Sequence, residues 1–128
     1  MTGASKKQGP KIAKVFRILV VEDEMMIAML MEDLLKSYGY EVVGPASRVE
    51  NAIHLVSSEA IDAGILDLNI ADEEVYPVAD ALAARSIPFL FISGYKASVI
   101  SQTYRDRPLL RKPFSTRLLK PTLQAILG

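Results

Sequence analysis

Apolar residues occur in two alternating patterns along the chain, as short continuous runs and as stretches with helical spacing. Continuous runs bounded by polar residues are typical of buried parallel strands, and they predict strands at 18–21, 41–44, 63–66, 88–92 and 109–110. Helical spacing predicts helices over 24–38, after Ser47, over 75–85, weakly over 97–104 and after Ser115. Five alternating strand–helix units predict an α/β fold, a parallel sheet covered by helices on both faces.

The first predicted helix has one apolar and one polar face. At 100° per residue the inward positions are Ile27, Leu30, Met31, Leu34 and Tyr38, and Gly39 ends the helix. Met25 and Met29 fall on the polar side. Two interpretations of these methionines stay open: an adaptable docking surface for another protein, or apolar residues exposed singly, which are common.

The second predicted helix begins with a capping box formed by Ser47 and Glu50. Its inward positions are Ala52, Ile53 and Val56. His54 is the only histidine, and no cysteine accompanies it, so we expect a surface residue that is neither a catalyst nor a transition-metal ligand. Pro77 suits the first turn of the third helix, whereas Pro121 should kink the last helix or delay its start.

Length and composition limit the class of protein. The 128 residues suffice for one compact domain, and 50% of them are hydrophobic, which allows a sizeable core. The absence of cysteine excludes a disulfide framework and a thiolate metal site. No apolar run approaches the ~18 residues of a membrane span, and no signal-peptide pattern opens the chain. We therefore expect a soluble, cytoplasmic protein that does not bind membranes.

Charge is distributed unevenly, although the net charge is zero. Residues 1–17 contain five lysines and arginines and no acid, so the other ten bases share the rest of the chain with all 15 acids. Such an arm either contacts nucleic acid or an acidic partner, or is a disordered solubilising leader. We adopt the second interpretation: a flexible basic leader over 1–14, a domain over 15–128, and no direct nucleic-acid binding.

Four of the five predicted strands end in polar side chains, at Glu22-Asp23, Asp67, Ser93 and Lys112. The carboxyl ends of parallel strands share one edge of the sheet, so these clusters converge in space. Three carboxylates near one point repel each other and need a cation. A few hard oxygen ligands suit Mg²⁺, with Mn²⁺ as a substitute, and the backbone carbonyl of Asn69 would complete the protein's ligands.

The same cluster contains the parts needed for phosphoryl transfer to a carboxylate. Asp67 can attack phosphorus as the nucleophile, and Mg²⁺ and Lys112 would balance the charge on the phosphoryl oxygens. The Ser93 hydroxyl and the amides after Asp67 would donate hydrogen bonds, and Gly94 leaves room for the phosphodonor. No serine–histidine or cysteine–histidine arrangement competes with this chemistry.

Four segments together resemble the receiver domain of two-component response regulators: Ile18–Glu24, Leu66–Asn69, Phe91–Tyr95 and Lys112–Phe114. Each is weak alone, but all four occur in order at strand ends, and the resemblance covers about residues 15–127. It implies a CheY-like, flavodoxin-like (βα)5 fold with strand order 2-1-3-4-5. Such a protein is not an enzyme beyond its own Mg²⁺-dependent self-phosphorylation and autodephosphorylation.

The resemblance also implies roles for individual residues. Asp67 would be the phosphoacceptor, with Asp23 a direct metal ligand and Glu22 acting through water. Ser93 and Lys112 would stabilise the phosphoryl group, and the Lys112–Pro113 bond would be cis. The donor would be a phosphohistidine on a histidine kinase or phosphotransfer protein, for which the two methionines above are candidate docking residues.

Two positions depart from the usual pattern of the family. Leu109 stands three residues before the lysine, where most receivers carry an aromatic switch residue. Residues 88–95, ending in Tyr95, resemble the signature of the atypical "FATGUY" single-domain regulators of alphaproteobacteria. We hypothesise that Tyr95 takes over part of the readout or shields the phosphoryl group; the alternative is an ordinary loop tyrosine.

The expected function is that of a single-domain response regulator, since no output domain follows the last predicted helix. It would contact a downstream protein or act as a phosphate shuttle or sink. The alternative is a receiver excised from a longer hybrid kinase or multidomain regulator. A haloacid-dehalogenase-type phosphatase would need a second aspartate where Asn69 stands. The retained acids and lysine argue against a pseudo-receiver that only binds partners.

Overall fold

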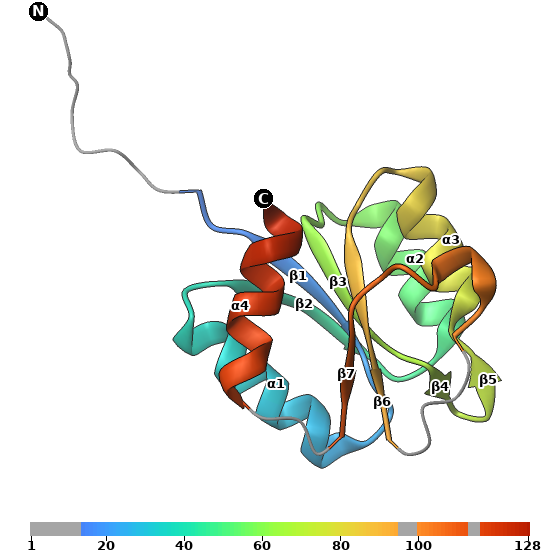
Figure 1. Ribbon diagram of the computed structural model, residues 1–128, viewed down its shortest axis with the longest axis horizontal. Helices are drawn as coiled ribbons and strands as arrows, with labels where there is room; N and C mark the ends of the chain where they lie inside the picture. The colour runs from blue at the N-terminus through green and yellow to red at the C-terminus, as the bar shows by residue number, and fades with distance from the viewer. Residues whose placement is uncertain (1–13, 95–99, 113–115) are drawn as a thin grey trace, which may run out of the picture.

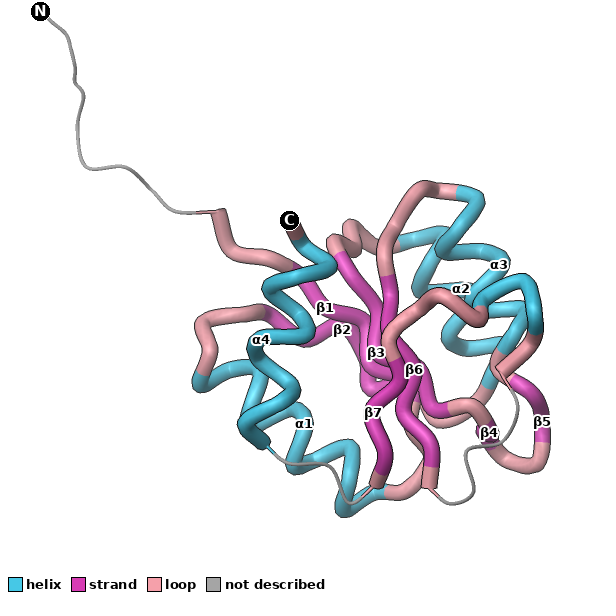
Figure 2. Tube along the Cα trace, in the orientation of Figure 1, coloured by secondary structure: helices cyan, strands magenta, loops and turns pink. Residues whose placement is uncertain are grey.

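A five-stranded parallel sheet forms the centre of the molecule in the computed structural model, which describes residues 14–94, 100–112 and 116–128 (Figures 1 and 2). The strand order is β2-β1-β3-β6-β7. These strands are β1 (Arg17–Val21), β2 (Glu41–Ala46), β3 (Ala63–Asp67), β6 (Phe89–Ser93) and β7 (Leu109–Arg111). The parallel α/β sheet and the strand order predicted from the sequence are thereby confirmed.

Helices cover both faces of this sheet, as Figure 1 shows. One face carries α1 (Met25–Ser37) and α4 (Thr116–Leu127), and the other carries α2 (Val49–Ser58) and α3 (Tyr76–Ala84). In β1, Ile18 and Val20 pack under α1 and α4, whereas Leu19 and Val21 pack under the opposite pair. All four side chains are fully buried, which explains the continuous apolar run of this central strand.

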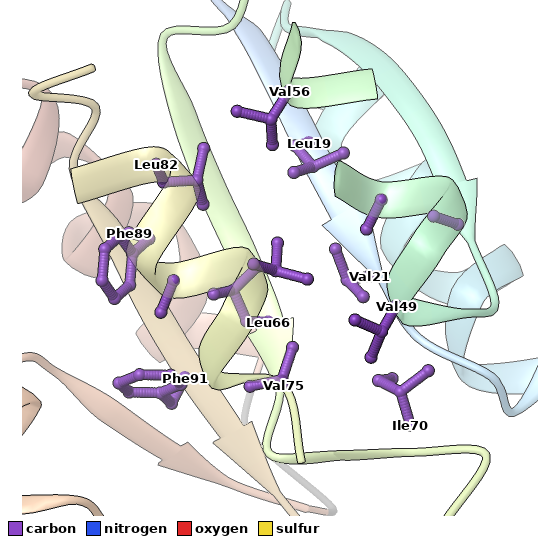
Figure 3. Packing of buried hydrophobic residues seen from close by; sticks show 14 of the residues in the cluster. Leu19, Val21, Val49, Val56, Leu66, Ile70, Val75, Leu82, Phe89 and Phe91 are labelled. Carbon is purple, nitrogen blue, oxygen red and sulfur yellow. The ribbon is translucent and has the colours of Figure 1, made fainter. Parts of the chain in front are cut away.

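Figure 3 shows the packing under α2 and α3. Large apolar side chains from the strands and from both helices meet there, among them Leu19, Val56, Leu66, Leu82 and Phe89. A short 3-10 helix, η1 (Gln102–Tyr104), adds Tyr104 to the same cluster. Because β3 is buried on both faces, its backbone is held rigidly and its last residue, Asp67, has a fixed position.

A small hairpin after β3 was not predicted from the sequence. It pairs β4 (Asn69–Ile70) with β5 (Glu73–Glu74) in antiparallel register. Its two turn residues, Ala71 and Asp72, have φ values of 49° and 66°. Alanine at positive φ gives no sequence signal for a turn, because this conformation normally favours glycine or asparagine.

Several details of the predicted helices are wrong. The buried stripe of α1 is Ala28, Met31 and Leu35, so Leu30 lies beyond its edge and is 42% exposed. In α2 the N-cap is Arg48 with no side-chain cap, so the predicted Ser47–Glu50 capping box does not form. Ile53 of α2 faces solvent because the buried stripe runs through Val49, Ala52 and Val56.

Other helix predictions are confirmed at the described positions. Pro77 lies in the first turn of α3, and His54 is exposed on α2. Of the weak helix predicted over 97–104, residues 97–99 lie outside the described ranges, and 102–104 form η1. Pro121 lies inside α4, which already starts at Thr116, so this proline does not delay the helix.

The two edges of the sheet differ in what they carry. Figure 1 shows α4 running back from the carboxyl ends of the strands, so that the C-terminal end of this helix lies near the amino end of β1. The carboxyl ends of β6 and β7 lie beside the start of α1.

Within the described ranges, no helix combines the length and the apolar character needed to cross a membrane.

Candidate functional site

Asp67 is the last residue of β3 and is almost completely buried, although its side chain is a carboxylate. Strands β1 and β6 flank β3, and Asp67 lies opposite Ile92 of β6. Its Oδ1 accepts a hydrogen bond from the backbone N–H of Asn69 at 3.1 Å. A buried carboxylate needs such partners to offset its lost hydration, and its second oxygen is bound by a lysine.

Lys112 follows β7 and brings one ammonium group to three carboxylates. Its Nζ donates hydrogen bonds to Asp67 Oδ2 at 2.7 Å, to Glu24 Oε1 at 2.6 Å and to Glu22 Oε2 at 3.2 Å. The backbone N–H of Lys112 donates to the carbonyl of Ser93 at 2.7 Å, which holds the lysine beside β6. Its side chain is only 9% exposed.

The charges around Lys112 favour its protonated form. Burial alone lowers the pKa of this lysine, because it disfavours the charged form. Hydrogen bonds to Asp67, Glu24 and Glu22 outweigh burial and raise the pKa above its ordinary value. Lys112 is therefore a permanent positive charge at neutral pH.

Glu22 is the most deeply buried of the three acids. Burial, together with the nearby Asp67 charge, raises its pKa from 4.5 to about 7, against the lowering effect of the Lys112 hydrogen bond and the Glu24 backbone N–H. The ion pair with Lys112 favours the ionised form of Glu22, whereas burial favours the protonated form. Burial has the larger effect on the pKa, because one ammonium is shared among three carboxylates and compensates the charge of each only in part.

The cluster has the charge and the donor atoms to hold a divalent cation. Oxygens of Glu22, Glu24 and Asp67 lie within 4.8 Å of one another, and three carboxylates outnumber the one ammonium. Glu22 Oε1 is buried 2.9 Å from Lys112 Nζ but accepts no hydrogen bond from the described residues. A buried carboxylate oxygen without a hydrogen bond, among other hard oxygen donors, fits Mg²⁺ or Mn²⁺.

Two of the metal ligands expected from the sequence lie at the border of this cluster. The Asp23 side chain is exposed, and its Oδ2 accepts a hydrogen bond from the Ala71 N–H at 2.9 Å, which ties it to the β4–β5 hairpin. Asn69 is exposed in β4, with its N–H on Asp67. Glu24 was not expected here, because it only marked the start of a helix in the sequence.

Ser93 and Gly94 lie where the sequence placed them, at the end of β6. Ser93 is buried one position beyond Ile92, the partner of Asp67. Among the described residues, the heavy atom nearest to a Cβ atom built on Gly94 is Lys112 Cδ at 4.0 Å, so none of them crowds this position. Tyr95 and the Lys112–Pro113 peptide bond lie outside the described residues.

An aromatic cluster lies between β6 and α3, close to Leu109. Leu109 is half-buried and pairs with Phe91 in the sheet. Tyr104 is buried against Phe89, with ring centroids 5.4 Å apart, and its hydroxyl donates a hydrogen bond to Asp80. Burial and this bond raise the pKa of Tyr104 to about 12. An aromatic ring therefore already occupies the core beside β6, although none stands at position 109.

Three of the four methionines of α1 are exposed, in the first two turns of the helix that follows Glu24. Met25 and Met29 are 75% and 55% exposed, and Met26, which the sequence analysis did not single out, is 79% exposed. This geometry fits both interpretations given above, a docking surface and singly exposed residues.

Comparison with known proteins places this geometry in a family. Residues 18–124 match the family described as the response regulator receiver domain. The chain is 27% identical to the transcriptional regulatory protein PdtaR of Mycobacterium tuberculosis and 33% identical to the phyllosphere-induced regulator PhyR of Methylorubrum extorquens. These matches cover 97% and 76% of the chain, but it spans only 62% and 38% of the two relatives.

One solved structure resembles most of the chain. The solution structure of SdrG from Sphingomonas melonis Fr1 is 42% identical and superposes with a TM-score of 0.81. The match covers 91% of this chain and 100% of that one. Together with the family match over residues 18–124, this likeness shows that the chain belongs to the response regulator receiver domain family of two-component systems.

Proposed function

We propose that the chain is a phosphorylatable response regulator in which Asp67 accepts a phosphoryl group from a histidine kinase or phosphotransfer protein. The contact between Asp67 Oδ2 and Lys112 Nζ, 2.7 Å long and buried at the end of β3, carries this proposal. It supplies a nucleophilic carboxylate and, beside it, a fixed positive charge for the phosphoryl oxygens.

The transfer replaces one bond to phosphorus by another. A carboxylate oxygen of Asp67 attacks the phosphorus of a phosphohistidine, the P–N bond breaks, and its electron pair remains on the imidazole nitrogen. The Asn69 N–H and Lys112 orient the carboxylate before attack. Lys112 and the Ser93 hydroxyl then bind the phosphoryl oxygens, at a buried site that limits attack by water.

Asp23, Asp67 and the Asn69 carbonyl would hold Mg²⁺ or Mn²⁺, with Glu22 acting through water. When bound, the ion balances the negative charge that gathers on the phosphoryl oxygens. Asp23 is exposed, and to bind the ion through Oδ2 it would give up the hydrogen bond that it accepts from the Ala71 N–H.

We further propose that the protein acts as a stand-alone regulator of the FATGUY type. The complete coverage of the SdrG chain supports this, as does the segment ending in Tyr95. Its output would be contact with a downstream protein, or service as a phosphate shuttle or sink. The alternative is a receiver within a longer kinase or regulator. It is supported by the match to PdtaR, because this chain spans only 62% of that protein. The length of the open reading frame distinguishes a stand-alone regulator from a receiver in a longer protein.

Phosphorylation by a small acyl phosphate in the presence of Mg²⁺ tests the assignment. We expect the wild type to gain the mass of one phosphoryl group and Asp67→Asn to gain none while remaining folded. Asp33→Asn, an exposed aspartate of α1, should be labelled like the wild type. A wild type that stays unlabelled with Mg²⁺, or labelling that survives Asp67→Asn, would contradict the assignment.

A further inference from the structure

Glu24 differs from the other two carboxylates that bind Lys112. Its contact with Nζ is the shortest of the three hydrogen bonds, at 2.6 Å. Its side chain is nevertheless 62% exposed, whereas those of Glu22 and Asp67 are 0% and 9% exposed. Among the described residues, Glu24 is therefore the one carboxylate partner of Lys112 that faces water.

The backbone of Glu24 is fixed while its side chain serves no helical purpose. Its N–H donates to Glu22 Oε2 at 2.9 Å, and its carbonyl accepts the first helical bond, from the Ala28 N–H. Glu24 is the N-cap of α1, but its side chain makes no capping hydrogen bond. The carboxylate can therefore leave Lys112 without disturbing the helix.

A phosphoryl group on Asp67 creates a competition for the ammonium of Lys112. An ammonium has three N–H donors, and all three are used by Glu22, Glu24 and Asp67. The phosphoryl group brings about −1.5 to −2 charges and strong acceptor oxygens. Asp67 itself frees one N–H, because the acyl phosphate removes its carboxylate charge. For the phosphoryl group to accept a second N–H of Lys112, another carboxylate must give up its bond. Releasing Glu22 would leave a buried charge without its cation, whereas Glu24 passes into water at little cost.

We infer that Glu24 is a positioning residue, the exchangeable partner that holds Lys112 before phosphorylation and yields it to the phosphoryl group. This inference rests on the proposed phosphorylation of Asp67. The carboxylate of Glu24 competes with the incoming phosphoryl group for the ammonium of Lys112. Removal of this carboxylate leaves Lys112 free to bind the phosphoryl group. The exchange also releases a charged side chain beside the exposed Met25 and Met26, so that the surface of α1 changes with the state of Asp67.

Glu24→Gln tests the inference, because glutamine keeps the length of the side chain and removes its charge. At saturating Mg²⁺ and low salt, we expect this variant to be phosphorylated by a small acyl phosphate about two- to fivefold faster than the wild type. The gain should shrink at high salt, which screens an exposed charge. Glu32→Gln, which removes a charge from the same helix at its pair with Lys36, is the matched control and should change the rate little.

A double-mutant cycle distinguishes action through Lys112 from a general effect of charge. In a Lys112→Ala background, Glu24→Gln should no longer accelerate phosphorylation. An equal acceleration in both backgrounds would overturn the inference. So would a lower affinity of Glu24→Gln for Mg²⁺ with an unchanged rate at saturation, because Glu24 would then be a metal ligand.

Nuclear magnetic resonance of the side-chain carboxyl of Glu24 gives a signature that a structural role would not produce. Its resonance should shift on phosphorylation of the wild type, because the carboxylate exchanges an ammonium for water, and an unchanged resonance would overturn the inference. A wild type that gains no phosphoryl group would refute the proposed function and this inference together. A wild type labelled as fast as Glu24→Gln would refute the inference alone.

Discussion

Replacing Glu22 with glutamine should stabilise the metal-free protein at pH 8. Burial raises the pKa of Glu22 from 4.5 to about 7, so its ionised form is less favourable in the folded chain than in the unfolded chain. Each unit of pKa corresponds to about 1.4 kcal/mol, so ionisation of Glu22 lowers the free energy of unfolding by about 3 kcal/mol. Glutamine avoids that cost and leaves Lys112 with two carboxylates, so we expect a gain of about 1–3 kcal/mol.

The gain should depend on pH in a defined direction. Below pH 4.5, Glu22 is protonated in both the folded and the unfolded chain, and its ionisation costs no stability. Between pH 4.5 and about 7 only the unfolded chain loses the proton, so the cost grows with pH, and above that range it is constant. The difference between Glu22→Gln and the wild type should therefore be largest at pH 8 and vanish near pH 4.

Urea unfolding at pH 8, 6 and 4 in the presence of a chelator measures this difference. When the chelator is replaced by Mg²⁺, the wild type should be stabilised more than the variant. Binding of the ion to the folded state adds to stability, and glutamine is a poorer ligand than glutamate. A variant less stable than the wild type at pH 8, or a gain that does not change between pH 8 and pH 4, would refute the reasoning.

Two further predictions concern residues away from the site. Asp62 accepts hydrogen bonds from Lys14 and the Arg17 N–H, which lower its pKa despite the opposing effect of burial, so Asp62→Asn should cost about 1–2 kcal/mol in urea unfolding at pH 7. That loss should shrink as pH falls through 3.8 and below, and a constant loss would contradict it. Tyr104→Phe keeps the ring packing but loses the bond to Asp80, and should cost about 0.5–1.5 kcal/mol. An equal loss in an Asp80→Ala background would show that this bond is not its cause.

The sheet was predictable because each of its strands contains a short apolar run, although β2 and β7 also contain exposed residues. The hairpin of β4 and β5 was not, since two-residue strands have no periodicity and the pair Glu73–Glu74 has low strand propensity. The buried faces of α1 and α2 were predictable only in part. Leu30 and Ile53 sit at the edges of apolar stripes, and the packing of the sheet decides which edge residues are covered.

The sequence predicted that Glu22, Asp67, Ser93 and Lys112 lie at one edge of the sheet, because parallel strands align their carboxyl ends. This argument places the backbone at the end of each strand and does not say which side chains meet. Glu24 reaches Lys112 across 88 positions of sequence only because α1 starts beside the end of β7. Asp23, next to it, points instead to the hairpin that the sequence did not reveal.

The return of α4 to the amino end of β1 has a practical consequence for experiments. The C-terminal end of α4 and the start of β1 lie at one edge of the sheet, and Asp67, the last residue of β3, lies at the other. The five residues of β3 separate these edges by roughly 16 Å at about 3.3 Å per residue. A fluorophore, a fused protein or a sensor surface attached beyond Leu127 therefore faces away from the incoming phosphodonor. Immobilisation through this end should leave the kinetics of phosphorylation unchanged.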